Sequence, residues 1–400
     1  MSTRVIRHIG ELITNDRTVG DGTAMGRLSD AALVVDEHRV LWCGRDRDAP
    51  AADEVIDANG AAVVPGFVDS HTHAVFAGER SDEFEARMAG VAYDGGGIWR
   101  TVEATRAATD EELRAQSTHR MRELRTGGVT TVEIKSGYEL TVAGEQRLLE
   151  VAGEFSDELT LLGAHVVPRE FAGDRDAYVA LVAGAMTNAC APLARWADVF
   201  CDRGAFDLDE ARHVLESAAR AGLQLRLHAN QLTDIGAIGL AVELGCASVD
   251  HCTHVGDADL DALASSSTVA TLLPGAEFST RSPYPSARRF LDAGVCVALA
   301  TDCNPGTSYV TSMALVIALG VREMGLSVDE ALWAATRGGA RALRRDDVGH
   351  LGVGARADLA ILDAPRAAHL AYRPGAALVA RTFRATREPG ERADIEPSRP

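Results

Sequence analysis

The sequence predicts an α/β protein whose main domain is a (β/α)8 TIM-like barrel, joined to a small β-sandwich domain. Three observations favour this fold. From Ala61 onward, short apolar runs alternate with longer helical patterns, the apolar runs number eight, and polar residues gather directly after them. A doubly wound parallel sheet is the structural alternative, but the count of eight and the placement of the polar residues favour the barrel.

The two ends of the chain have a different texture from the middle. The first 60 residues contain short β-like runs broken by Gly, Asp and Asn, such as ALVVDEHRVLWCG, and HLGVGARADLAILDA near the other end is similar. We therefore expect residues 1–60 and 346–385 to build one discontinuous β-sandwich domain around a barrel of residues 61–345. The polar, Pro-containing residues 386–400 are expected to form a disordered tail.

Eight candidate barrel strands follow in order along the middle of the chain. Each is a short apolar run that ends in polar residues or in a turn signal. The runs are AAVVPGFVDSHTH, GVTTVEIKSGYEL, LTLLGAHVVP, ADVFCDRGAF, LQLRLHANQ, CASVDHCTHV, TVATLLPGAEF and VCVALATDCNPG.

Helical patterns lie between most of these strands. The segment TDEELRAQSTHRMRELRTGG has Thr109 or Asp110 as a possible N-cap and acidic residues in its first turn, and Gly127 is a plausible C′ glycine. The segments LDEARHVLESAARAGL, DIGAIGLAVELG and SARRFLDAG repeat this scheme. A further helical stretch is expected from Met313 to about Arg345.

Composition excludes several classes of protein. The 46% apolar content suffices for a sizeable core, and no window approaches the 18 apolar residues of a membrane span. The opening MSTRVIRHIGELIT lacks the features of a signal peptide, and the seven scattered cysteines form no C-x-x-C pair. A reducing, cytoplasmic location is therefore expected. A net charge of −18 without a basic stripe argues against a nucleic-acid partner.

One cationic residue is unusual. Of 40 lysines and arginines, only Lys135 is a lysine. Nucleotide composition of the gene can explain the arginine bias, but it does not explain why one lysine remains. Because arginine cannot replace a compact ammonium in a tight space, Lys135 is a candidate site residue.

Polar residues collect at the carboxyl ends of the predicted strands. Six of the twelve histidines lie there, and this face of a barrel is where active sites form. The residues at these strand ends are His71, His73, Lys135, Tyr138, His165, His228, Gln231, His251, His254, Asp302 and Asn304.

The H-x-H spacing of His71 and His73 places both side chains on one face of a strand. His228 and Asp302 can reach the same point from other strands, and three imidazoles with a carboxylate suit Zn²⁺ or iron. The alternative, histidines satisfied within the core, would require several imidazoles to cluster without a ligand. For proton transfer near such a metal, Asp302 and His251 are the candidate catalytic residues.

These segments together resemble the amidohydrolase superfamily, and most closely its imidazolonepropionase family. The segments that carry the resemblance are VVPGFVDSHTHAVFAGER, GGGIWRTVEATR, GVTTVEIKSGYEL, LGAHVVPREF, HANQL, VDHCTHV and TDCNPGTS. FAGER, KSGYEL, GAHVVP and DCNPGTS are more specific than H-x-H, which occurs throughout the superfamily.

The resemblance implies hydrolysis of the cyclic C–N bond of 4-imidazolone-5-propanoate to N-formimino-L-glutamate, a step of histidine degradation. It also implies a homodimer, and one Zn²⁺ or iron ion held by His71, His73, His228 and Asp302. Members with two metals carry a carboxylated lysine after strand four. Here that strand ends FCDRGAF, which favours a single metal.

The propionate tail of that substrate suits Arg80, whose guanidinium can clamp a carboxylate, and the phenol of Tyr138. A solvated loop arginine is the alternative for Arg80, and ordinary surface packing is the alternative for Tyr93. The resemblance adds further substrate contacts from His165, Asn304, Gly306, Thr307 and Tyr93. Tyr93 lies beside DGGGIW, which lacks the frame of a phosphate-binding loop and is interpreted as a flexible lid.

One position departs from some members of the family. Gln231 stands in HANQL where a glutamate can stand, and an amide cannot act as a base. We expect Gln231 to orient the substrate while His251 and Asp302 move protons. Two alternatives are a ring aminohydrolase and a barrel scaffold without catalysis. Arg80 and Tyr138 disfavour the aminohydrolase, because a neutral ring substrate needs no carboxylate clamp. A scaffold would be signalled by the loss of a metal ligand, and all four predicted ligands are present.

Overall fold

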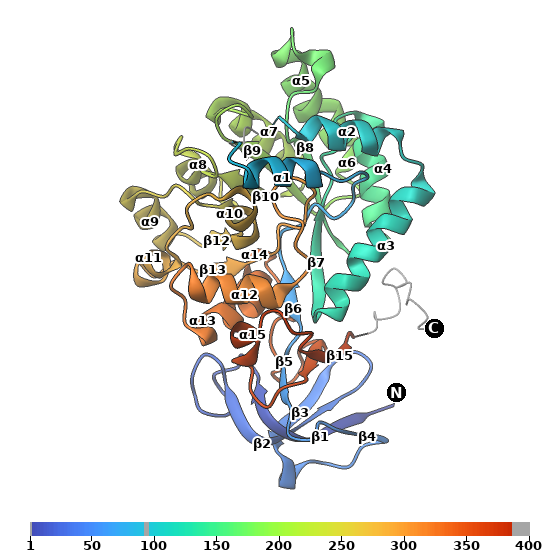
Figure 1. Ribbon diagram of the computed structural model, residues 1–400, viewed down its shortest axis with the longest axis vertical. Coiled ribbons are helices and arrows are strands. Elements are labelled where there is room, and N and C mark those ends of the chain that lie inside the picture. The colour runs from blue at the N-terminus through green and yellow to red at the C-terminus, as the bar shows by residue number, and fades with distance from the viewer. Residues whose placement is uncertain (1, 92–95, 386–400) are drawn as a thin grey trace. The chain divides into compact units, whose positions relative to one another are not determined.

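The computed structural model describes residues 2–91 and 96–385, whose strands form two sheets (Figure 1). One is a parallel sheet of eight strands in the order β13-β12-β11-β10-β9-β8-β7-β6. These strands are β6 (Phe67–Asp69), β7 (Val129–Lys135), β8 (Glu158–Ala164), β9 (Trp196–Cys201), β10 (Gln224–Ala229), β11 (Ser248–His251), β12 (Val269–Leu272) and β13 (Val297–Leu299).

All eight predicted strands are present, and the sheet curls toward closure. A parallel bridge joins Thr72, which follows β6, to Cys303, which follows β13, and His73 N–H donates to the Cys303 carbonyl at 3.0 Å. The prediction of a (β/α)8 barrel is therefore confirmed, and the doubly wound sheet is not.

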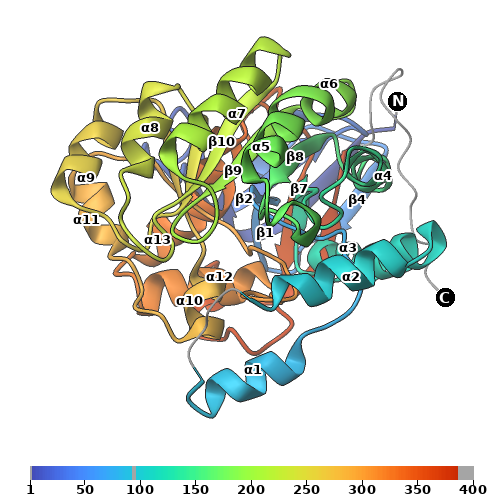
Figure 2. The same ribbon diagram turned by 90° about the horizontal axis from the view of Figure 1, so that it is seen from above.

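Helices follow most of the barrel strands. Figure 2 shows α7 and α8 outside the strands, and they pack on β9 and β10. The helices of the described residues are α1 (Ser81–Met88), α2 (Ile98–Ala107), α3 (Asp110–Thr126), α4 (Val142–Ala152), α5 (Arg175–Leu181), α6 (Thr187–Cys190), α7 (Leu208–Arg220), α8 (Ala237–Glu243), α9 (Asp257–Ala264), α10 (Pro274–Thr280), α11 (Ala287–Asp292), α12 (Met313–Arg322), α13 (Val328–Trp333), α14 (Gly339–Ala342) and α15 (His369–Tyr372).

Helix α3 shows how local sequence sets these boundaries. Thr109 is its N-cap: the Glu112 N–H donates to the Thr109 hydroxyl at 3.2 Å, and the Glu112 carboxylate accepts from the Thr109 N–H at 2.8 Å. At the other end, the left-handed residue is Gly128, with φ +91°, rather than the expected Gly127. Gly127 still bonds back into the helix, since its N–H donates to the Glu123 carbonyl at 2.9 Å.

The second sheet has seven strands in the order β15-β14-β5-β1-β2-β3, with β4 paired to β1. Its residues come from both ends of the chain, which confirms the expected discontinuous β domain; its strands are hydrogen-bonded into one sheet. The strands are β1 (Arg4–Ile13), β2 (Arg27–Val35), β3 (Val40–Arg45), β4 (Glu54–Asp57), β5 (Ala62–Pro65), β14 (Leu359–Leu362) and β15 (Val379–Phe383).

The apolar run AAVVPGFV, a single strand in the sequence analysis, divides into two strands. β5 pairs antiparallel with β14, whereas β6 begins the barrel two residues later. The chain passes between them at Gly66, where a Cβ atom would lie 2.2 Å from the Thr130 hydroxyl oxygen. Only glycine therefore fits this change of sheet without moving Thr130.

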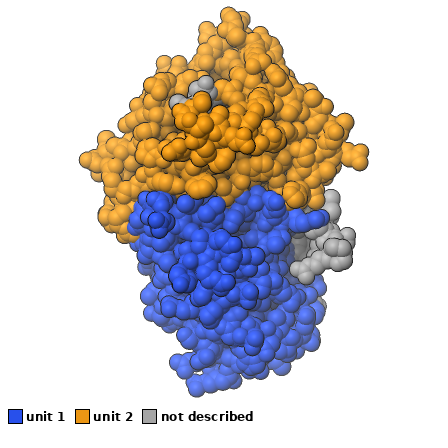
Figure 3. Space-filling view, in the orientation of Figure 1, with its two compact units in different colours: residues 1–70, 122–131, 311–400 blue, residues 71–121, 132–310 orange. Residues whose placement is uncertain are grey.

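By internal contacts, the chain divides into two compact units (Figure 3). The first contains residues 1–70, 122–131 and 311–400, and the second contains residues 71–121 and 132–310. The domain boundaries expected from the sequence stay a prediction, and the expected tail, residues 386–400, lies outside the described residues. No disulfide joins any of the seven cysteines, and no described helix is long and apolar enough to cross a membrane.

Candidate active site

Four side chains meet at the carboxyl ends of the barrel strands. The Nε2 atoms of His71 and His73 each lie 3.5 Å from Oδ1 of Asp302, and Nε2 of His228 lies 3.4 Å from Nε2 of His73. All four residues are buried. The sequence analysis predicted this set as metal ligands, and the fold brings it together from β6, β10 and β13.

The spacing of these atoms suits a metal ion. Ligand atoms about 2.1 Å from a tetrahedral metal lie roughly 3.4 Å from one another. Nε2 of His71 is buried without a hydrogen-bond partner among the described residues. Burial lowers the pKa of His71 and of His73 well below the ordinary value, so both imidazoles are neutral, the form that binds metal. Burial also raises the pKa of Asp302 well above its ordinary value, although hydrogen bonds from Asn304 and Thr307 and the charge of Lys135 act in the opposite direction.

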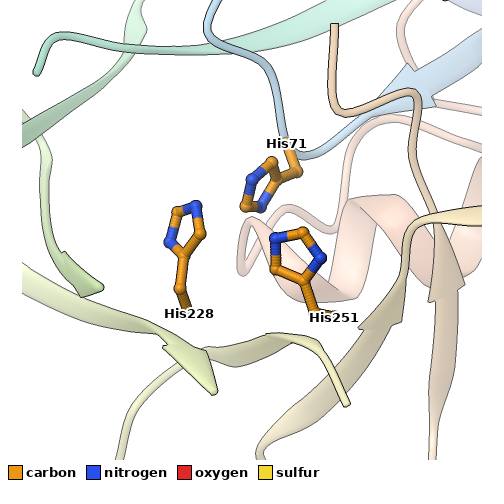
Figure 4. Close-up of side chains that lie close together, drawn as sticks. All are labelled: His71, His228 and His251. Carbon is orange, nitrogen blue, oxygen red and sulfur yellow. The ribbon is translucent and has the colours of Figure 1, made fainter. Parts of the chain in front are cut away.

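His251 lies beside this group. Figure 4 shows the rings of His71, His228 and His251 facing one another from three parts of the chain, and one nitrogen of each lies within 4.8 Å of the others. The ring centroid of His251 lies 5.8 Å from that of His71 and 5.4 Å from that of His228. Its position suits either proton transfer or a fifth ligand.

Three polar residues at these strand ends, and Cys252 beside one of them, have a left-handed backbone. The φ angles are +53° at Asn230, +80° at His251 and +52° at Asp302. Such angles cost free energy for L-residues with side chains and often occur where function requires a side chain in a given direction. Two of the three are the predicted catalytic residues.

A pocket opens directly over these residues. It is lined by His73, Arg80, Ile98, Tyr138, His165, Val166, Phe200, His228, Gln231, Leu232, His251, Asp302, Asn304, Gly306 and Thr307. With one exception, every predicted substrate-binding residue lies in this wall. The exception is Tyr93, which lies outside the described residues.

Arg80 is buried in the pocket wall and already has one carboxylate partner. Its Nε and Nη2 donate to Glu83 at 3.0 and 2.6 Å. The bidentate pair fixes the guanidinium plane, which passes close to Gly306: a Cβ atom there would lie 2.3 Å from Nη1. A solvated loop arginine would show neither feature, so the geometry disfavours that alternative, and the binding role of Arg80 stays a prediction.

His165 and Tyr138 form an aromatic part of the pocket wall. Their ring centroids are 5.3 Å apart, and His165 stacks on His73 at 5.3 Å. Because a carbonyl only accepts, the 3.0 Å contact between Nδ1 of His165 and the Gly137 carbonyl places the proton on Nδ1. Burial lowers the pKa of His165 to about 3, which leaves Nε2 as a neutral acceptor.

Asn304 organises the loop that follows β13. Its Oδ1 accepts from the N–H groups of Gly306 and Thr307 at 2.8 and 2.7 Å, and its Nδ2 donates to the Asp302 carbonyl at 2.7 Å. The sequence analysis expected Asn304 to bind substrate. That expectation stays a prediction; in this structure the Asn304 amide also shapes the loop, which Arg87 holds by donating to the Gly306 carbonyl at 2.7 Å.

Two buried charged groups near the site were not given a catalytic role by the sequence analysis. Lys135 is fully buried between carboxylates; burial opposes its charge, but Asp198 and Glu133 raise its pKa. Glu277, on α10, is also buried, and burial raises its pKa to about 7. The signal for both was a charged residue within or directly after an apolar run. His254, in contrast, is exposed.

Comparison with known proteins agrees with the family resemblance drawn from the sequence. The amidohydrolase family pattern matches residues 62–387. Imidazolonepropionase from Mycolicibacterium smegmatis is 60% identical over 384 residues, which cover 96% of this chain and 97% of that protein. Imidazolonepropionase from Salinispora arenicola is 62% identical over 381 residues, which cover 95% of this chain and 97% of that protein. The chain belongs to the imidazolonepropionase family of amidohydrolases.

The fold of this family member extends to more distant proteins. A crystal structure of a triazine hydrolase variant superposes with a TM-score of 0.71 over 96% of this chain and 92% of the other, at 20% identity. At that identity the likeness concerns the fold alone.

Proposed function

We propose that the chain hydrolyses the ring C–N bond of 4-imidazolone-5-propanoate to N-formimino-L-glutamate, in the degradation of histidine. The observation that carries this proposal is that three of the four candidate metal ligands and a buried arginine line one pocket, with the fourth, His71, 3.5 Å from Asp302. The names of relatives that are about 60% identical support the same reaction.

One Zn²⁺ or iron ion per chain is proposed as the cofactor, held by His71, His73, His228 and Asp302. Imidazole and carboxylate donors suit both metals. Bound there, the ion would supply Lewis acidity that polarises a carbonyl group and lowers the pKa of a water molecule.

Asp302 and His251 are proposed to move the protons. A carboxylate oxygen of Asp302 accepts the proton of the attacking water, and His251 assists its delivery to the ring nitrogen that leaves. Burial lowers the pKa of His251 well below the ordinary value, so the ring is a neutral acceptor at the start of the reaction.

The remaining residues of the pocket are proposed to bind the two ends of the substrate. Arg80 pairs with the propionate, and Tyr138 donates its hydroxyl to the same group. Nε2 of His165 accepts from a ring N–H, and Gln231 orients the ring. The further substrate contacts proposed are Asn304, Gly306, Thr307 and Tyr93.

Assembly and location are also proposals. Family likeness and the dispersed negative charge favour a homodimer in the cytoplasm, with a small molecule as partner and without nucleic-acid or membrane partners.

The test is incubation of the metal-loaded protein with freshly made 4-imidazolone-5-propanoate. Loss of the ring chromophore with formation of N-formimino-L-glutamate, and without release of ammonia, is the expected result. Release of ammonia from a ring amidine would favour an aminohydrolase instead. No turnover with metal present would contradict the proposed substrate.

A further inference from the structure

Beneath the metal-binding side chains lies a second group of charged residues. It consists of Glu133 and Lys135 on β7, Asp198 on β9, Arg226 on β10 and Asp250 on β11, and we call it the Lys135 cluster. Each member is at most 2% exposed. A charge held in a dry interior is costly unless its partners are close, so such a cluster needs a structural reason.

Lys135 connects the three carboxylates of the cluster. Its Nζ lies 2.8 Å from Oε1 of Glu133, 2.8 Å from Oδ2 of Asp198 and 3.9 Å from Oδ2 of Asp250. Arg226 adds a contact of 3.2 Å between Nη2 and Oδ2 of Asp250. A compact ammonium with three donors fits this meeting point, where a planar guanidinium would not.

Two of these carboxylates contact metal-ligand histidines directly. Oδ2 of Asp250 lies 2.8 Å from Nδ1 of His71, and Oδ2 of Asp198 lies 3.0 Å from Nδ1 of His228. Asp198 also accepts from the backbone N–H of His228 at 3.1 Å. The contact of Asp250 with His71 is a hydrogen bond, and a carboxylate so placed keeps the proton on Nδ1 and leaves Nε2 for a metal. At His228, Asp198 holds the backbone by its hydrogen bond and lies against the ring with its charge.

Glu133 acts on the backbone between His71 and His73. Its Oε2 accepts from the Thr72 N–H at 3.1 Å, and its backbone carbonyl accepts from the Thr72 hydroxyl at 2.7 Å. Thr72 separates His71 from His73. Each carboxylate that meets Lys135 therefore holds a different part of the ligand set.

We propose that Lys135 is a positioning residue, which locks Glu133, Asp198 and Asp250 so that three metal-ligand histidines stay aimed at one point. The inference rests on the proposed function, because it assumes that these histidines bind a metal. The cluster's three carboxylates and two cations leave one net negative charge, which adds to the attraction for a cation.

The test measures metal affinity and the unfolding temperature of the metal-free protein separately. Lys135→Met, which keeps the length of the side chain without its charge, is expected to weaken binding of Zn²⁺ by about 10- to 100-fold. Zn²⁺ affinity is measured by competition with a chromophoric chelator. As a control, Glu158→Gln changes a buried carboxylate that accepts hydrogen bonds from Arg195 and Trp196, and Zn²⁺ affinity should stay the same.

A double variant separates positioning from charge balance. Lys135→Met with Glu133→Gln restores the net charge of the cluster, so the unfolding temperature of the metal-free protein should recover toward that of the parent. Zn²⁺ affinity should remain low, because Asp198 and Asp250 still lack their ammonium. Full recovery of affinity would overturn the positioning role.

Two further outcomes complete the design. If Lys135→Met does not fold, Asp198→Asn keeps the shape of the side chain and should also weaken Zn²⁺ binding; unchanged affinity in either variant overturns the inference. A parent protein that binds Zn²⁺ tightly, loses it in these variants and yet does not turn over 4-imidazolone-5-propanoate would contradict the proposed function and support the inference.

Discussion

At the scale of single residues, the pocket contains groups proposed to hold substrate and groups proposed to move protons. Gln231 lines the pocket but carries no acid or base, whereas His251 and Asp302 lie against the histidines proposed to bind the metal. Substitution of the Gln231 amide is therefore expected to affect kcat and KM differently from substitution of His251 or Asp302.

Gln231→Glu is expected to change kcat by less than about tenfold, because the protons already have acceptors in Asp302 and His251. Steady-state rates at several pH values measure the effect. Gln231→Leu serves as the comparison, since it removes hydrogen bonding and should raise KM. A rise in kcat of about a hundredfold or more in the glutamate variant would show that a carboxylate had been missing.

Arg80→Ala is expected to raise KM about 10- to 100-fold, because hydrogen bonds to charged groups contribute about 1.5–3 kcal/mol. For a substrate analogue without the propionate carboxylate, KM of the Arg80→Ala variant should be almost the same as KM of the parent. Arg114, an exposed partner of Glu154, offers a matched control: Arg114→Ala should leave KM and kcat unchanged. Equal losses for both substrates in the Arg80 variant would argue for a structural role instead.

Glu277 should make stability depend on pH. Burial raises its pKa from 4.5 to about 7, while the Thr253 hydroxyl donates to it at 2.7 Å. The unfolded chain releases this proton near pH 4.5 and the folded protein only near pH 7. The stabilisation is therefore complete below pH 4.5 and is lost as pH rises through 7, by at most about 3 kcal/mol.

Glu277→Gln should remove that loss, so the variant should be more stable than the parent at pH 8, with a smaller difference at pH 4.5. Urea unfolding at both pH values measures it. Glu216→Gln, the same change on the surface of α7, is the control. Parallel pH profiles for parent and Glu277→Gln would contradict the expectation.

At the scale of elements, the glycine between β5 and β6 has a specific steric reason. Gly66→Ala is expected to destabilise the protein by about 1–3 kcal/mol, because the added Cβ overlaps the side chain of Thr130. Combination with Thr130→Ala should recover part of the loss. Gly173→Ala, where a Cβ meets nothing within 4 Å, should be nearly neutral in the same thermal unfolding experiment.

The elements also show how far the sequence could be interpreted. The eight apolar runs predicted eight barrel strands because buried parallel strands are continuous apolar stretches. The split of AAVVPGFV into β5 and β6 was missed, since both halves are equally apolar and only their partners differ. Whether Gly127 or Gly128 takes the left-handed turn was likewise settled by the hydrogen bonds of the last helical turn.

At the scale of the whole molecule, metal binding should contribute to stability. A ligand that binds only the folded state stabilises it by about 2.7 kcal/mol at 100 times its Kd. Removal of the metal by a chelator is therefore expected to lower the unfolding temperature, and return of Zn²⁺ or iron should restore it. Calorimetry with metal analysis checks both changes.

His73→Ala should abolish the effect of the metal on the unfolding temperature. His254→Ala, at an exposed position, should preserve this effect. Less than roughly 0.3 equivalents of bound metal per chain in the parent would favour the scaffold alternative instead; sites of this kind hold their metal tightly.

The sequence by itself determined the barrel, the histidines of H-x-H and their partners His228 and Asp302, because these follow from local periodicity and from the order of the strands. Only the tertiary structure decided which partners the buried charged residues have. The meeting of Lys135 with Asp198 and Asp250 joins residues from three separate strands. No periodicity encodes such distances, since they depend on how the closed sheet brings its strand ends together.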